Sequence, residues 1–150
     1  MVFVCLLCAV FRQITGFVFV VRHQQYILRG SEKKNMISSL LEVPEAENSQ
    51  FEFKSSKTES SSLGRKLCKA ASAFSNSGGG TFIVGLNDEG IADGGIAPTV
   101  GRTSISDWID TKLRLVRPAV NYTVTIFEAS DGRGLVEQER IVLAVESKRR

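Results

Sequence analysis

Residues 73–88 read AFSNSGGGTFIVGLND, and the prediction of the fold starts from this segment. Its glycine run at 78–80 tolerates the left-handed backbone that commonly ends a helix. The apolar run at 81–86 is typical of a short strand that is covered on both faces. A helix before the glycines and a strand after them reverse the order found in a phosphate-binding loop. We therefore predict a helix C-cap at the glycines and do not expect ATP binding.

The residues before this stretch predict a helix and a strand. Residues 61–76 carry an apolar stripe at helical spacing, and the serines at 60–62 are candidate N-caps. Residues 50–55, QFEFKS, alternate strictly between polar and apolar, which predicts a half-buried strand. Glu52 and Lys54 then lie on the face opposite the two phenylalanines. The stripe of the predicted helix consists of Leu63, Leu67, Ala70, Ala71 and Phe74.

Turn signals and a second helix follow. Glycine-rich turns are expected at 87–90 and 92–95. Residues 104–116 predict a helix, which Pro118 ends because proline disfavours helical backbone at the residue before it. The inward residues of this helix are expected to be Ile105, Ile109, Leu113 and Val116.

The C-terminal residues predict two strands, over 122–127 and 140–146, that are joined through a turn around 131–134. The whole order is then strand, helix, strand, helix, strand, strand. This order predicts an α+β (mixed α/β) fold, a small domain with a β-sheet packed against two main helices.

The N-terminal residues do not share this pattern. Residues 1–35 begin with two apolar runs separated by Arg12, which a spanning helix would place near the middle of the bilayer at a cost of about 2.5–3.5 kcal/mol. Three interpretations stay open: a strand-like extension, a weak membrane anchor, or upstream sequence ahead of a later start at Met36. The first and last are favoured, so a membrane partner is not expected, and the domain is placed at 36–150.

A short helix is expected over residues 31–42, where SEKKNMISSLLE supplies Ser31 as an N-cap. Its apolar stripe would consist of Met36, Leu40 and Leu41. The polar residues 43–49 then link it to the domain core.

Composition restricts the chemistry. The formal net charge of +3 permits a polyanionic partner without requiring one. The three cysteines have no spacing typical of a disulfide framework, which favours a cytoplasmic protein. The single histidine, His23, lies outside the patterned region, which removes Ser-His-Asp and Cys-His catalysis. No group of cysteines and histidine has the spacing of a zinc site. Any chemistry would depend on carboxylates, lysines or hydroxyls.

The motifs at 51–54 (FEFK) and 73–88, with a glycine turn after them, resemble the Schlafen-like AlbA (AlbA_2) domain family. Members show a Glu-Phe-Lys strand, a helix ending in Ala-Phe-Ala-Asn, paired glycines and a Gly-Val-Asp-Asp turn. The matching residues here are 52–54, 73–76, 79–80 and 85–88. The family domain usually continues past a segment like ESKRR, so the resemblance implies a chain truncated at the C-terminus.

The resemblance implies a DNA-binding module of the transcriptional-regulator type. Phosphate contacts would supply affinity without a base code, and no cofactor is needed for them. The partner is expected to be DNA or RNA, and a homodimer is left open. The alternative interpretation is that these cations only form solvated faces. The residues expected to bind the nucleic acid are Lys54, Lys57, Arg65, Lys66 and Lys69, with Arg102 as a further candidate.

A second function is implied by vertebrate Schlafen proteins, in which this domain can be an endoribonuclease with two glutamates and an aspartate on a divalent metal. Those positions fall on Glu47, Glu52 and Asp88, so these are the expected catalytic and metal residues, with Mg²⁺ or Mn²⁺ as the cofactor. Asn87 replaces the first aspartate of the turn. The simpler interpretation makes Glu52 a solvated strand residue and Asp88 a turn former. A third possibility is a truncated product with no function of its own.

Overall fold

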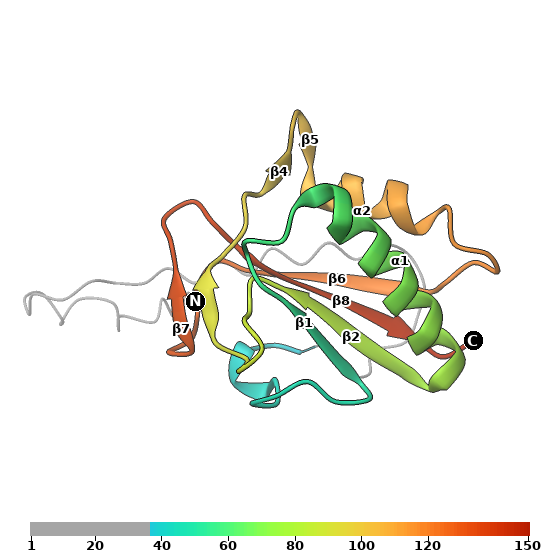
Figure 1. Cartoon of the computed structure of the whole chain (residues 1–150), viewed down its shortest axis with the longest axis horizontal. Coiled ribbons are helices and arrows are strands. Elements are labelled where there is room, and N and C mark those ends of the chain that lie inside the picture. Colours follow the sequence, from blue (N-terminus) through green and yellow to red (C-terminus); the bar gives the residue numbers. More distant parts are fainter. Residues whose placement is uncertain (1–36) are drawn as a thin grey trace, which may run out of the picture.

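A four-stranded mixed sheet forms the centre of the structure, a computed structural model that describes residues 37–150 (Figure 1). The strand order is β1-β2-β8-β6. β1 runs parallel to β2, and β8 is antiparallel to both β2 and β6. The strands are β1 (Phe51–Lys54), β2 (Gly79–Val84), β6 (Tyr122–Phe127) and β8 (Val142–Lys148).

Two helices, α1 (Ser60–Ser77) and α2 (Ile105–Leu113), cover one face of this sheet (Figure 1). The predicted apolar stripes of both helices are buried, and they pack on Phe82 of β2 and Leu143 of β8. Gly78 ends α1 with φ +113°, so the predicted glycine C-cap is confirmed. The α+β class with two main helices is therefore correct.

The opposite face of the sheet is covered by a short 3₁₀ helix, η1 (Leu40–Glu42), and by the segment after β2. Leu40 and Phe53 are fully buried there together with Ile83. Since Phe82 and Ile83 belong to different clusters, β2 is buried on both faces, as its apolar run predicted.

Two smaller sheets lie beyond the main one. β3 (Ala92–Gly94) pairs in parallel with β7 (Gly134–Val136), and β4 (Thr99–Val100) forms a hairpin with β5 (Thr103–Ser104). The prediction of a simple turn at 92–95 was therefore wrong, because those residues form a strand with a partner about forty positions away in the chain. A local pattern does not reveal such a partner.

Several element boundaries differ from the predictions. The N-cap of α1 is Glu59, without a side-chain cap hydrogen bond, and Ser60 already lies inside the helix. α2 ends at Leu113 rather than at 116, although Val116 is still buried. β8 begins two residues later than expected, since register with β2 and β6 determines its ends.

The short helix expected over 31–42 is mostly wrong within the described part. Only Leu40–Glu42 is helical there, and Ser39 caps it by accepting from the Leu41 N–H. Leu40 is buried, but Leu41 is 66% exposed. Ser31 and Met36 lie outside the described residues, as does the N-terminal extension at 1–35. Among residues 37–150, none of the helices has the length and apolar character that crossing a membrane requires.

Candidate functional site

Strand β1 places Glu52 and Lys54 on the side of the sheet that carries the helices. Glu52 is in register with Phe82 and Lys54 with Val84, and both partners belong to the core beneath α1 and α2. Phe53 points to the opposite core, because side chains alternate along a strand. The predicted separation of the two faces of β1 is confirmed.

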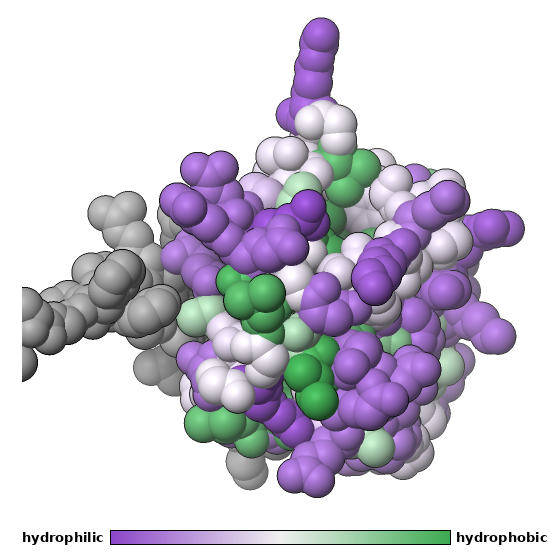
Figure 2. Space-filling model, turned by 60° about the vertical axis from the view of Figure 1, so that its left-hand side comes forward, coloured by the Kyte–Doolittle hydropathy of each residue, from purple (hydrophilic) through white to green (hydrophobic). Residues whose placement is uncertain are grey.

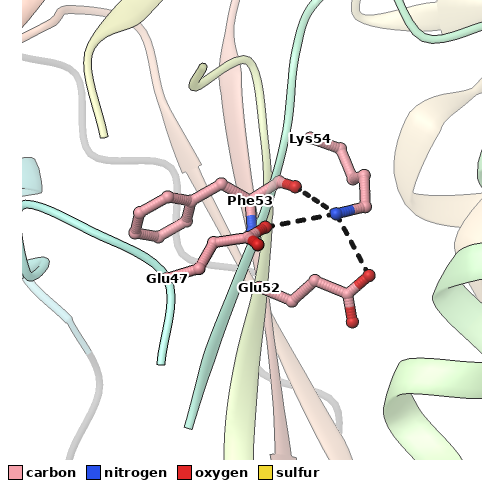
Figure 3. A network of polar contacts seen from close by, with 4 residues as sticks. All are labelled: Glu47, Glu52, Phe53 and Lys54. Carbon is pink, nitrogen blue, oxygen red and sulfur yellow. Dashed lines mark hydrogen bonds and ion pairs between the residues drawn. The ribbon is translucent and has the colours of Figure 1, made fainter. Parts of the chain in front are cut away.

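The ammonium group of Lys54 lies between two carboxylates (Figure 3). Its Nζ is 3.2 Å from Oε1 of Glu47 and 3.1 Å from Oε1 of Glu52. The Lys54 side chain is only 18% exposed, against 42% for Glu47 and 34% for Glu52. Glu47 and Glu52 are thus brought together, and Lys54 is the cation they share.

Glu47 also closes the free edge of β1. Its Oε1 accepts a hydrogen bond of 2.6 Å from the backbone N–H of Phe53. β1 is the edge strand of the main sheet, so this N–H has no strand partner on its outer side. The fixed position of the Glu47 carboxylate therefore has a structural cause.

Asp88 does not join this pair. It lies in the turn after β2 and is exposed, while Asn87 and Gly90 hold the turn through a backbone hydrogen bond. Within residues 37–150, no three Asp, Glu, His or Cys side chains are grouped closely enough to hold a metal ion. In this arrangement of the described residues the three carboxylates do not form one group, and the metal role of Glu47, Glu52 and Asp88 stays a prediction.

A different carboxylate, Asp93, lies beyond the carboxyl end of β1. It accepts hydrogen bonds from the Ser55 hydroxyl at 2.6 Å and from the Ser56 N–H at 3.0 Å. Burial alone would raise the pKa of Asp93, but these hydrogen bonds outweigh it and hold the pKa below its ordinary value of 3.8. The sequence does not mark Asp93 as a site residue, because an aspartate between an alanine and two glycines has the appearance of a turn former.

The cations of α1 are placed differently from Lys54. Arg65, Lys66 and Lys69 are exposed, and their side chains make no hydrogen bond or ion pair with the rest of the described chain. Lys57, in the loop before α1, is exposed in the same way. α1 contains no acidic residue, so the basic patch that Arg65, Lys66 and Lys69 form on its outer face is not neutralised within the helix.

The contact between α1 and α2 adds an aromatic ring beside this basic face. Lys112 of α2 lies over the ring of Trp108, 5.5 Å from its centroid, and both side chains pack against Gly64 of α1. Any larger residue at 64 would press against them, because a Cβ there would lie 3.2 Å from Cε of Lys112. No sequence pattern marks Trp108 or Lys112, since their contact with α1 depends on how the two helices pack against each other.

A family model described as Schlafen, AlbA_2 matches residues 47–150 of the chain. The protein therefore belongs to the Schlafen AlbA_2 family, and the resemblance found in the sequence is confirmed. Membership in this family indicates a nucleic-acid-binding domain as its coarse function. No protein with curated annotation matches the sequence.

Proposed function

We propose that this domain is a DNA-binding module of the transcriptional-regulator type, and that the outer face of α1 holds the phosphate backbone. One observation carries the proposal. Arg65, Lys66 and Lys69 are exposed cations with no partner in residues 37–150. Arg114 and Arg140, by contrast, form ion pairs with carboxylates of their own segments.

The physical reason is counterion release. Each phosphate that a lysine or arginine neutralises frees condensed cations from the DNA, so affinity falls steeply as salt rises. A cation already paired inside the protein would first lose that partner, which makes Lys54 a weaker contributor than the cations of α1. These contacts position the DNA without reading its bases.

The test measures binding of a fluorescent DNA duplex at several salt concentrations. The slope of log K against log salt is expected to shrink by about 0.9 for each phosphate contact removed in the triple variant Arg65→Ala, Lys66→Ala and Lys69→Ala. Arg140→Ala is the matched control, because it removes an exposed but ion-paired arginine. The proposal is contradicted if the slope is unchanged in the triple variant, or if the affinity of the wild type does not depend on salt concentration.

Trp108 offers a second readout, because it is the only tryptophan of the chain. Its ring is partly exposed next to α1 and lies beneath Lys112. Binding of DNA to this face is expected to change the fluorescence of Trp108, and the triple variant should need more DNA for the same change. Sedimentation of the same samples checks for the homodimer.

A metal-dependent endoribonuclease is the second candidate. The observation in its favour is that oxygens of Glu47 and Glu52 both lie within 3.2 Å of one atom, Nζ of Lys54, at the sheet edge. Incubation of a structured RNA with Mn²⁺ or with EDTA tests it on denaturing gels. Cleavage that needs the metal and disappears in Glu52→Ala would support this candidate, and RNA that stays intact under all conditions would exclude it.

A further inference from the structure

The β4–β5 hairpin projects from the described part of the structure (Figure 1). It stands at the top of Figure 1, and in the turned view of Figure 2 it rises above the surface as a hydrophilic column. Thr99 pairs with Ser104 and Val100 with Thr103, so only Gly101 and Arg102 connect the two strands. Gly101 has φ +62°, a conformation that two-residue hairpins require at this position and that glycine adopts readily.

The base of this hairpin is held firmly. The Ile105 N–H donates to the Pro98 carbonyl at 2.9 Å and closes the loop. Ser104 caps α2 by accepting from the Asp107 N–H at 3.1 Å. Val100 packs against the core beneath the helices. The tip is therefore presented on a fixed support, and its position follows from that of α2.

Arg102 at the tip is exposed, and its guanidinium has no hydrogen bond or ion pair with residues 37–150. The acidic group near the base, Asp107, is already engaged with the Ser104 hydroxyl at 2.7 Å. α2 joins the hairpin to the basic face of α1 through the packing of Trp108 on Gly64. The hairpin that carries Arg102 is thus connected, through α2, to the helix that carries the proposed phosphate contacts.

We propose that the β4–β5 hairpin inserts Arg102 into the minor groove of a DNA duplex whose backbone is held by α1. This inference rests on the proposed DNA-binding function. It adds which groove of the duplex the protein contacts and which residue makes that contact. The minor groove is about 6 Å wide, which admits a single side chain on a two-residue turn but excludes a helix. A·T tracts narrow this groove and deepen its negative potential, which attracts arginine.

The consequence is a preference for A·T-rich duplexes without any major-groove code. A guanine amino group protrudes into the minor groove of G·C pairs and opposes the approach of a cation donor. The hairpin would contribute this preference, whereas the cations of α1 contribute sequence-independent affinity. A-form RNA should show no such preference, because its minor groove is wide and shallow.

The experiment compares two duplexes of equal length and phosphate number, one with a central A-tract and one with alternating G·C pairs. The wild type is expected to bind the A-tract duplex at least about fivefold more tightly, the lower end of what one specific groove contact contributes. Arg102→Ala and Arg102→Gln should each bring the two affinities together. Arg65→Ala should weaken binding to both duplexes by the same factor and preserve their ratio.

The outcomes separate this inference from the proposed function. The proposed role of the hairpin is overturned if the wild type binds in a salt-sensitive way but does not prefer the A-tract duplex. It is also overturned if the preference persists in both Arg102 variants. In either case the proposed role of α1 is unaffected. Absence of salt-sensitive binding to either duplex overturns both. A minor-groove-binding polyamide gives a measurement that needs no variant: it should displace the wild-type protein from the A-tract duplex, and failure to do so also overturns the inference.

Discussion

The Glu47 carboxylate and the backbone N–H of Phe53 are joined by a hydrogen bond of 2.6 Å, six residues apart in the chain. This bond occupies the outer edge of β1, where a strand N–H has no ladder partner. The same oxygen of Glu47 lies 3.2 Å from Nζ of Lys54. One carboxylate therefore closes the sheet edge and anchors the lysine that also contacts Glu52.

Removal of this acceptor should destabilise the fold more than removal of its neighbour. Glu47→Ala is expected to lower the free energy of unfolding by about 1–2 kcal/mol, because the part-buried Phe53 N–H loses its partner. Glu52→Ala should cost at most about 1 kcal/mol, since it removes only a partly exposed ion pair. Urea denaturation of both variants measures the difference. Equal losses would show that the bond to Phe53 contributes nothing.

The pairing of β3 with β7 depends on Gly134. Its φ is +93°, and a Cβ there would collide with the carbonyl oxygen of Ala92. Gly132 is the matched control, with φ +88° and open space around the same position. Gly134→Ala should therefore be less stable than Gly132→Ala by about 1–3 kcal/mol, since backbone strain is common to both and only the clash differs. Denaturant midpoints that coincide would contradict the observed pairing.

Asp93 should stabilise the protein in its ionised form. Its pKa lies below 3.8 in the folded state, so its contribution is fully present above that value and is lost as pH falls through the folded pKa. Asp93→Ala is expected to cost about 1–3 kcal/mol near pH 7, because the Ser55 and Ser56 donors lose a charged acceptor.

The difference between wild type and Asp93→Ala should shrink as the solution becomes strongly acidic. Chemical denaturation at a series of pH values follows this change. Asp93→Asn keeps an acceptor oxygen without the charge, and its stability should fall between the other two at neutral pH. A gap between wild type and Asp93→Ala that is the same at every pH would refute a depressed pKa.

Glu146 is predicted to behave in the opposite way. Burial on β8 raises its pKa above the ordinary value of 4.5, although Lys148 acts in the opposing direction. An acid with a raised folded pKa costs stability as pH rises from the unfolded value through the folded one. Glu146→Gln should therefore be more stable than the wild type at pH 7 and equal to it at pH 3. A variant that is less stable at both pH values would contradict this.

The class of fold followed from patterns that lie within single elements. The stripe of α1 and the glycines after it predicted a helix end at Gly78, where the structure has it. The apolar run of β2 predicted burial on both faces, because a strand without alternation of polar and apolar residues has no polar face to expose to water. The cations of α1 were also visible in the sequence, since a residue off the apolar stripe of a helix faces solvent.

The contacts between the side chains of the candidate sites could not be predicted from the sequence. The sequence predicted Lys54 as a DNA contact and Glu47 and Glu52 as metal ligands, and it gave no sign that Lys54 forms ion pairs with both glutamates. Asp93 and the β3–β7 pairing depend on segments that meet only after the chain has folded. Each strand of the hairpin that carries Arg102 is only two residues long, which is too short to show the alternating pattern of a strand.

The two main helices, the strands of the central sheet and the family follow from the sequence, because apolar periodicity, glycine positions and short motifs are properties of neighbouring residues. Tertiary structure alone decided which charged groups are free and which are engaged. An ion pair such as Lys54 with Glu47 forms through side-chain orientation across a strand edge, and no linear pattern records that orientation. The cations of α1 and Arg102 differ from Lys54 in what surrounds them, and that difference makes them the candidates for contact with DNA.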